Sequence, residues 1–218
     1  MLVSLWKWAG VLLGIVVSLC AHANVDEMAN SLSEPQKVIK QASDQVIHVL
    51  TAERESFNND PGKVYDLVNE YILPHFDFEL MSYYVLGGYW KNASEQQKVG
   101  FQTQFRRLLV RTYATAFSDY KDEKIEFLSD IKTGNEDHII VQTKIHQKGA
   151  SPIAVAYRMI NSGNTWKIYD VSIGGVSLVT NYRANFSGQV RRKGLDKLIE
   201  SLAEHNKPVK DQPVDSPK

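Results

Sequence analysis

The sequence predicts an α+β domain in which a twisted, mostly antiparallel four-stranded sheet packs against helices. Three observations lead to this prediction. Apolar residues recur at helical spacing up to about residue 120, alternate with a period of two from about residue 125 to residue 173, and then return to helical spacing. The alternating segments follow one another through short turns, which is the order of a meander. We therefore expect the helices to lie on one face of the sheet.

The first 23 residues are predicted to be a signal peptide. Lys7 supplies its positive start, and Ala9–Ala21 is an apolar run of 13 residues, which is too short to span a bilayer. Ala21-His22-Ala23 has the A-x-A pattern of a cleavage site. We therefore expect cleavage after Ala23 and a mature chain that begins at Asn24.

The mature chain is predicted to lack cysteine and to be almost neutral. Cys20 lies within the signal peptide; a lipoprotein signal modified at Cys20 is the alternative, which the bulky Leu19 disfavours. Removing Lys7 from the 25 basic residues leaves 24 against 25 acidic residues, a net charge of −1. This balance gives no indication of binding to nucleic acid or to a strongly charged membrane surface. An exported bacterial chain of this kind fits the periplasm.

The domain should cover residues 24–206, followed by a disordered tail over residues 207–218, where prolines are mixed with charges. N-cap residues, prolines and glycine pairs delimit four helices in its first half. These are expected at about residues 35–55, 61–73, 78–86 and 95–120. The third is capped by Asp77, and the fourth begins in the capping box Ser94–Gln97.

The four strands are expected at about residues 125–131, 139–145, 153–159 and 166–173. The stretch Trp166–Phe186 holds the last of them and is expected to be the centre of the domain. Its apolar residues fall on both parities, so we expect this strand to be covered on both sides. Gly174-Gly175 then breaks the period, and Val176 is expected to open a helix that folds back over the sheet. A final helix should start at Leu195.

Motifs for chemistry on this chain are weak. The histidines of the mature chain are scattered without ligand spacing, and no nucleophile elbow, phosphate-binding loop or dinucleotide fingerprint occurs, so no cofactor or metal is expected. Asp170 and Asp77 are the candidates for a general base. The alternative, which we favour, is a hydrogen-bonded structural carboxylate at Asp170 and a helix cap at Asp77, because neither has a placed partner in the sequence.

Two basic groups, Arg106-Arg107-Arg111 and Arg191-Arg192-Lys193, admit two interpretations. They could contact a phosphate or an anionic partner, or they could form a solvated helix face and stabilise a helix C-terminus. The large apolar side chains on several helices and on one sheet parity also admit two interpretations. They predict either an ordinary core or a deep apolar cavity for a lipid.

The chain resembles the MlaC-type periplasmic phospholipid-binding proteins, also called the toluene-tolerance Ttg2 family. The matching pieces keep their order over residues 33–206, and the set is specific although each piece alone is weak. They are ILPHFDFELM at Ile72–Met81, VLGGYW at Val85–Trp90, the series Gln97, Phe101, Phe105, Leu109 and Tyr113, WKIYDVSIGGVSLVTNYRANF at Trp166–Phe186, and GLDKL at Gly194–Leu198.

The resemblance implies a carrier that shuttles phospholipids between the inner and outer membranes and maintains the lipid asymmetry of the outer membrane. It also implies an NTF2-like cone with acyl chains buried between sheet and helices, and a headgroup near solvent. The implied partners are an inner-membrane ABC transporter complex with an MCE-domain protein and an outer-membrane lipoprotein–porin complex. No covalent chemistry is required for such a role, so we do not expect an enzyme.

On this interpretation we predict which side chains line the lipid cavity, choosing them by sheet parity and helical stripe. They are Leu73, Phe76, Met81, Val85, Leu86, Phe105, Leu109 and Tyr113 from the helices, and Val155, Tyr157, Trp166, Ile168 and Val176 from the sheet. Arg111 or Arg183 could reach a headgroup phosphate. Two alternatives remain: an NTF2-like enzyme of the isomerase or hydratase type, and an adaptor subunit of an envelope complex that binds no ligand.

Overall fold

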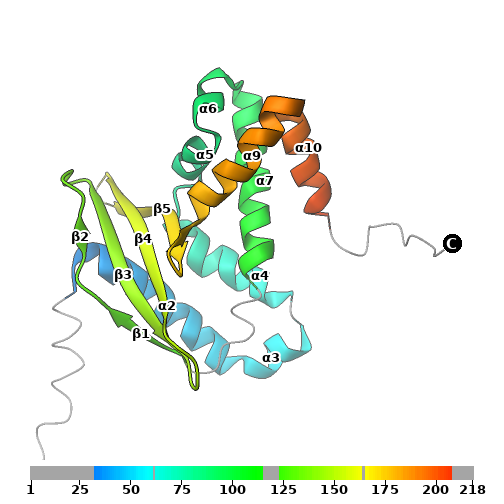
Figure 1. The fold of residues 1–218 in the computed structure, drawn as a ribbon. Helices are drawn as coiled ribbons and strands as arrows, with labels where there is room; N and C mark the ends of the chain where they lie inside the picture. The colour runs from blue at the N-terminus through cyan, green and yellow to red at the C-terminus, as the bar shows by residue number, and fades with distance from the viewer. Residues whose placement is uncertain (1–31, 61, 115–122, 164, 208–218) are drawn as a thin grey trace, which may run out of the picture. The chain divides into compact units, whose positions relative to one another are not determined.

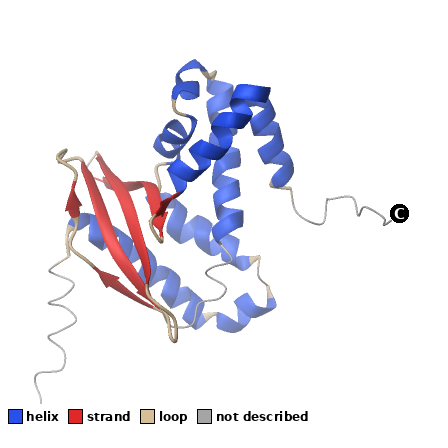
Figure 2. Cartoon of the chain, viewed as in Figure 1, coloured by secondary structure: helices blue, strands red, loops and turns tan. Residues whose placement is uncertain are grey.

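The computed structural model describes residues 32–60, 62–114, 123–163 and 165–207 (Figure 1). The predicted signal peptide, the start of the mature chain, the end of the fourth predicted helix beyond residue 114, and residues 208–218 of the predicted tail lie outside these ranges. The described residues from Glu34 on belong to one compact unit. Along the chain a run of strands lies between two groups of helices, and Figure 2 shows the strands gathered in one sheet beside the helices, which confirms the α+β prediction.

The first predicted helix is divided in two. Helix α2 spans Glu34–Ala52, and helix α3 spans Arg54–Asn59. Glu53 between them has φ −115° and ψ 25°, outside the helical region, which ends one helix and starts the next. Helix α2 buries Ile39, Val46 and Leu50, which recur at helical spacing and form the stripe that faces the rest of the unit.

The second predicted helix changes its pitch twice. It starts as helix α4, Lys63–Leu67, widens to a π-helical turn η1, Val68–Ile72, and tightens to a 3₁₀ turn η2, Leu73–His75. Pro74 has no backbone N–H and stops the helical hydrogen bonding here, as the sequence predicts. The chain leaves η2 in an extended conformation at Phe76, which brings it alongside the sheet.

The next helices follow their capping signals. Asp77 accepts a hydrogen bond of 2.8 Å from the backbone N–H of Leu80 and caps helix α5, Phe78–Leu86. Gly87, at φ +55°, ends α5 and leads into the short helix α6, Gly88–Asn92. Ser94 and Gln97 exchange side-chain and backbone hydrogen bonds at the start of helix α7, Glu95–Tyr113, so the predicted capping box is confirmed.

The sheet contains six antiparallel strands in the order β1-β3-β4-β5-β6, with β2 also paired to β3. The strands are β1 Lys124–Phe127, β2 Ile131–Lys132, β3 His138–His146, β4 Ile153–Ser162, β5 Thr165–Ile173 and β6 Val176–Ser177. The four longer strands are the predicted ones. Two short strands were not predicted separately: β2 is the broken end of the first predicted strand, and β6 follows the glycine pair.

The apolar face of the sheet is continuous across three strands. Directly paired residues lie on the same face, and the pairs Val141–Tyr157, Thr143–Val155 and Ile139–Met159 carry this face from β3 to β4. Helix α2 packs against η1 and also contacts β3 and β5. This arrangement buries Val141 and Met159 completely.

A β-bulge explains why apolar residues fall on both parities of β5. The register shifts between Arg158 and Met159, so that Tyr157 pairs with Val171 whereas Met159 pairs with Ile168. One extra residue on β5 therefore places Val171 and Ile168 on the same face although they differ in parity. The two apolar parities therefore come from the bulge and do not mark two apolar faces. The strand is nevertheless buried on both sides at its centre, because Asp170 and Val171, which face opposite sides, are both buried.

The chain after β5 forms a tight hairpin before it turns helical. Gly174 and Gly175, both at positive φ, connect Ile173 to its cross-strand partner Val176 in β6. Helix α9 begins only at Leu178 and spans Leu178–Lys193, so the prediction that Val176 opens the helix was wrong. Helix α10, Leu195–His205, follows and packs against α7 and α9.

Asp170 joins strand β5 to the start of α9. Its carboxylate accepts hydrogen bonds from the Ser177 hydroxyl at 2.7 Å and from the Val179 backbone N–H at 3.1 Å. The Nε of Arg158 lies 3.7 Å away on the neighbouring strand. Only 4% of Asp170 is exposed, so these contacts replace the water that the carboxylate loses on folding. The preferred prediction of a structural carboxylate is confirmed.

We expect Asp170→Ala to lower the free energy of unfolding by about 2–4 kcal/mol, because two donors would be left without their acceptor in a buried site. Urea unfolding followed by circular dichroism would measure the change. Asp44→Ala is the matched control: its ion pair with Lys40 is exposed on α2 and should contribute less than about 1 kcal/mol. Equal losses in the two variants would contradict the structural role of Asp170.

Candidate functional site

The side chains predicted to line a lipid cavity lie mostly in one apolar cluster. Twelve of the thirteen belong to it, eight buried and four half-buried at its edge. The buried ones are Leu73, Met81, Val85, Leu86, Phe105, Leu109, Val155 and Ile168. The half-buried ones are Phe76, Tyr113, Tyr157 and Trp166. Val176 is 58% exposed at the β5–β6 hairpin and lies outside the cluster.

The cluster joins a helical part to a sheet part at one backbone junction. Phe76 forms a parallel bridge with Ile168 on β5, and the Asp77 N–H donates to the Ile168 carbonyl at 2.8 Å. The Phe76 ring is stacked on Phe78 with 5.6 Å between the ring centroids. This junction puts the start of α5 beside strand β5. The helical and sheet members of the predicted lining therefore meet here.

Aromatic side chains form the contact between helices α7 and α9. Phe105 packs edge-on against Tyr182 at 5.2 Å and is stacked on Phe101 at 5.5 Å. Phe186 lies edge-on to Phe101 at 5.9 Å. Phe101 and Phe105 are completely buried, and neither Phe101, Tyr182 nor Phe186 was among the predicted lining residues. The helical spacing of Tyr182 and Phe186 was the sequence signal that pointed to this aromatic contact between α7 and α9.

Two tyrosines of the predicted lining have raised pKa values. Burial, and then the neighbouring Tyr182, raise the pKa of Tyr113 to about 12. Burial also raises the pKa of Tyr157, while a hydrogen bond with the Thr143 side chain acts in the opposite direction. Both phenols therefore stay neutral throughout the physiological range. A neutral hydroxyl within an apolar layer is compatible with lipid chains as neighbours.

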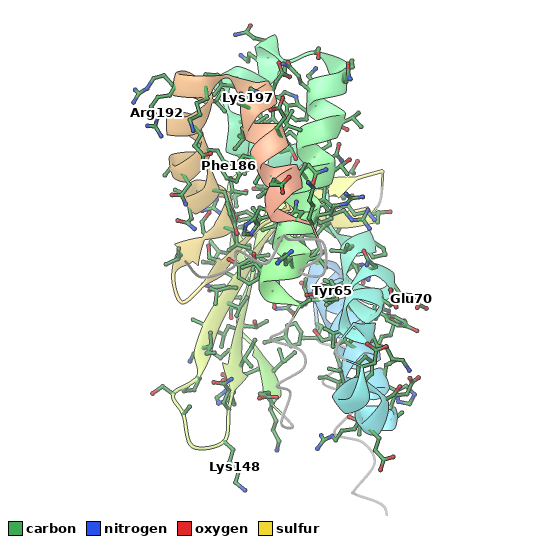
Figure 3. All side chains as sticks on the ribbon, turned by 90° about the vertical axis from the view of Figure 1, so that its right-hand side faces the viewer. Tyr65, Glu70, Lys148, Phe186, Arg192 and Lys197 are labelled. Carbon is green, nitrogen blue, oxygen red and sulfur yellow. The ribbon has the colours of Figure 1, made fainter. Side chains whose placement is uncertain are left out.

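A groove of about 890 Å³ runs beside helix α7. Both apolar and polar side chains line it, and none of the described residues among them is acidic. The lining residues are Tyr65, Asn69, Phe78, Gln102, Thr103, Arg106, Arg107, Val110, Arg111 and Asn206. Figure 3 shows Tyr65 next to one end of α7. Of the two predicted headgroup candidates, Arg111 lies in this groove, together with Arg106 and Arg107 of the same basic group.

Three arginines of α7 line the groove, and two of them are held by contacts. The Arg106 guanidinium lies over the Phe78 ring, 5.7 Å from its centroid, and donates to the Asn69 side-chain oxygen at 3.2 Å. Arg111 donates to the Lys207 carbonyl at 2.7 Å. The second headgroup candidate, Arg183, lies elsewhere: its guanidinium packs against Gly87, where an added Cβ would come within 3.0 Å of it.

The two candidate carboxylates have structural partners. Asp77 caps α5, and Asp170 accepts a hydrogen bond from the Val179 N–H at the start of α9. Within the described ranges, no group of three or more His, Cys, Asp or Glu side chains could hold a metal ion. No helix in the described part of the chain is long and apolar enough to cross a membrane. The described residues provide an apolar cluster and a basic groove.

Comparison with known proteins decides the family. The model of the MlaC protein family matches residues 40–204, which include α4 to α10 and the entire sheet. The chain belongs to the MlaC protein family. The resemblance inferred from the sequence pieces is thereby confirmed, and the matched segment contains every residue of the predicted lipid-lining set.

Individual relatives in the MlaC family agree with this result. The chain is 28% identical over 204 residues to the intermembrane phospholipid transport system binding protein MlaC of Haemophilus influenzae, covering 92% of this chain and 94% of that one. It is 25% identical over 193 residues to the toluene tolerance protein ttg2D of Pseudomonas putida, covering 87% and 88%.

A solved MlaC-like structure has the same fold. It is a phospholipid-binding protein from Ralstonia solanacearum in complex with a phospholipid, with a TM-score of 0.73 and 28% sequence identity to this chain. The similarity covers 80% of this chain and 97% of that one. The helices, the sheet and their connections are therefore shared with a protein that holds a lipid.

The pKa of Tyr113 gives a test of the α7–α9 contact. Tyr182→Phe should lower this pKa from about 12 towards 10 because it removes the neighbouring hydroxyl, although burial should keep it above 10. Difference titration of phenolate absorbance against a Tyr113→Phe background measures the value. Between pH 10 and 12 the unfolded state loses this proton while the folded state keeps it, so the free energy of unfolding should fall as the pH rises.

Tyr157→Phe is the control for this titration, because its ring lies on β4 and not between α7 and α9. It should leave the Tyr113 transition in place. A Tyr113 pKa that does not move in Tyr182→Phe would show that the two hydroxyls do not interact in solution.

Proposed function

We propose that the chain is a periplasmic phospholipid carrier that moves lipids between the inner and outer membranes and helps to maintain the lipid asymmetry of the outer membrane. The observation that carries this proposal is the shared fold with a relative that was solved with a phospholipid bound. Membership of the MlaC family and a relative named for intermembrane phospholipid transport support it.

The physical requirement of such a carrier is an apolar environment for acyl chains. A buried methylene contributes about 0.8 kcal/mol, so one chain of ~16 carbons exposed to water costs roughly 13 kcal/mol. Apolar surface inside the carrier must offset most of this cost. The cluster that holds the predicted lining residues supplies such surface on α5, α7, β4 and β5.

In this proposal the acyl chains enter the cluster between the helices and the sheet. Half-buried side chains at its edge, Phe76, Tyr113, Tyr157 and Trp166, are the entry contacts, because they already have part of their surface uncovered. Met81 and Phe105 are completely buried in contact with the rest of the cluster. An acyl chain that reaches them has to move these helices apart and replace the contacts it breaks. Val176 is not among the entry contacts, because it is mostly exposed and lies outside the cluster.

Binding without chemical conversion follows from the same features. The two candidate carboxylates accept hydrogen bonds at the starts of α5 and α9, and apolar burial holds acyl chains without a placed reactive group. The proposed partners are the membrane complexes that release and accept lipid: an inner-membrane ABC transporter with an MCE-domain protein, and an outer-membrane lipoprotein–porin complex. The resemblance of the sequence to the family supports this part of the proposal.

Native mass spectrometry of the chain from Asn24 on, purified without detergent, tests the carrier function. We expect about one phospholipid per chain, because the cluster has to be filled by the lipid it transports. Exchange with labelled phospholipid in liposomes should replace it. A chain that is empty after purification and takes up no lipid from liposomes would rule out the carrier.

Tryptophan fluorescence tests where the acyl chains lie. From Asn24 on, the chain has two tryptophans, Trp90 and Trp166. Trp166 belongs to the predicted lining and lies on β5. Trp90 lies on α6, packs against Tyr83 of α5 and Lys98 of α7 at another part of the cluster, and is not in the predicted set. A phospholipid with brominated acyl chains should quench most of the Trp166 emission in Trp90→Phe and little of the Trp90 emission in Trp166→Phe. The opposite pattern would place the chains elsewhere.

A further inference from the structure

We infer that the groove beside α7 binds the phosphate of a phospholipid through Arg106, Arg107 and Arg111, and that this contact lets the protein distinguish phospholipids from neutral lipids with the same acyl chains. The inference rests on the proposed carrier function and adds a headgroup site to it. It assigns the groove a role that apolar burial alone does not provide.

The charge of the groove is the first argument. Three guanidinium groups lie within six residues of one helix, and Arg107 and Arg111 are one turn apart on the same face. No acidic residue is among the described residues that line the groove, and no ion pair in the described part of the chain involves these arginines. Like charges at this spacing repel one another, so an anion in the groove lowers their energy.

The second argument is the geometry of the donors. Arg106 is held by Phe78 and Asn69, and Arg111 by the Lys207 carbonyl. Each of these arginines uses one hydrogen bond of the five that a guanidinium can donate. The planar guanidinium group of arginine presents donors that match the oxygens of a phosphate. A side chain that is already restrained loses less conformational entropy when it binds a phosphate. The two anchored arginines are thus prepared to bind a phosphate, with Arg107 between them in sequence.

The third argument is the apolar path that leads away from the arginines. Phe78 and Val110 belong to the groove, and Phe78 is stacked on Phe76. Phe76 in turn bridges Ile168 on strand β5. A molecule with a phosphate at one end and acyl chains at the other fits this order, because its charge meets the arginines while its chains continue along the aromatic rings into the apolar cluster.

The other basic group of the chain lacks these features. Arg191, Arg192 and Lys193 are exposed in the last turn of α9, where positive charge is favourable next to the helix C-terminus. They do not line the groove. Figure 3 shows Arg192 on α9, away from Tyr65 at the groove. This group therefore provides a control with the same change of charge.

The experiment compares two ligands in three proteins. Liposomes present a phospholipid and a diacylglycerol with identical acyl chains, and native mass spectrometry measures the occupancy by each. The proteins are the unaltered chain, the variant Arg106→Gln/Arg107→Gln/Arg111→Gln, and the control Arg191→Gln/Arg192→Gln/Lys193→Gln. Circular dichroism and urea unfolding establish that each variant is folded.

We expect the unaltered chain and the control to prefer the phospholipid by about tenfold or more, as hydrogen bonds to charged groups imply. The groove variant should lose this preference while it still takes up diacylglycerol. Added salt should weaken the preference in the unaltered chain. Arg107→Gln alone should reduce it several-fold, and because Arg107 has no hydrogen bond or ion pair within the described residues, this variant keeps the contacts of the other two arginines.

Three results would overturn the inference. An unchanged preference in the folded groove variant would leave the carrier function intact but remove the headgroup site. Calorimetric binding of inorganic phosphate that the groove variant loses, with an unchanged lipid preference, would make the groove a site for free phosphate. If the groove variant keeps its lipid preference but no longer transfers lipid to acceptor membrane complexes, the groove is a surface for a protein partner. Failure of the unaltered chain to take up either lipid would instead contradict the carrier function itself.

Discussion

Asp170 keeps its carboxylate in a site where 4% of the residue is exposed, and this is possible only because Ser177, Val179 and Arg158 lie around it. The same contacts determine where helix α9 starts. Helix α9 then packs against α5 and contacts α7 through its aromatic side chains. A single buried charge thus connects strand β5 to the helical layer, since moving the helix away would leave that charge without donors.

The second connection between strand β5 and the helices is made by backbone atoms. The Asp77 N–H and the Ile168 carbonyl form a hydrogen bond at the end of a helical segment whose pitch changes from α to π to 3₁₀. Pro74 prevents a regular helix from continuing past this point. As a result, α5 begins beside the sheet, and the apolar residues of helices and strands form one cluster.

The two parts of the proposed binding site contribute different properties. The free energy gained from apolar burial is roughly proportional to the buried area and does not depend on direction. It therefore gives affinity for any acyl chain. The arginines of the groove act on one group at a defined place and would give selectivity. A carrier that has to release its cargo benefits from this division, because a small number of polar contacts is easily exchanged for contacts with the accepting complex.

Local chemistry in the sequence was sufficient for much of the fold. The change of period from helical to alternating located the sheet, and Asp77 and the box Ser94–Gln97 located the starts of two helices. These features depend on residues at most four positions apart. Twelve of the thirteen apolar candidates lie in one cluster, whereas Val176 belongs to a two-residue strand that depends on pairing with Ile173. That these side chains line a lipid cavity stays a prediction.

Contacts between distant residues were decided only by the tertiary structure. The bulge in β5 depends on the register with β4, so the sequence argument could not see that Val171 and Ile168 share a face. The groove depends on Phe78, Asn69 and Arg106, which come from three segments, and the sequence alone left open whether its arginines were solvent-facing or gathered at a site. Periodicity and helix capping involve residues within one turn or one strand, so the sequence by itself determined these local features. Register, burial of charge and convergence of side chains arise from packing, and only the folded chain shows them.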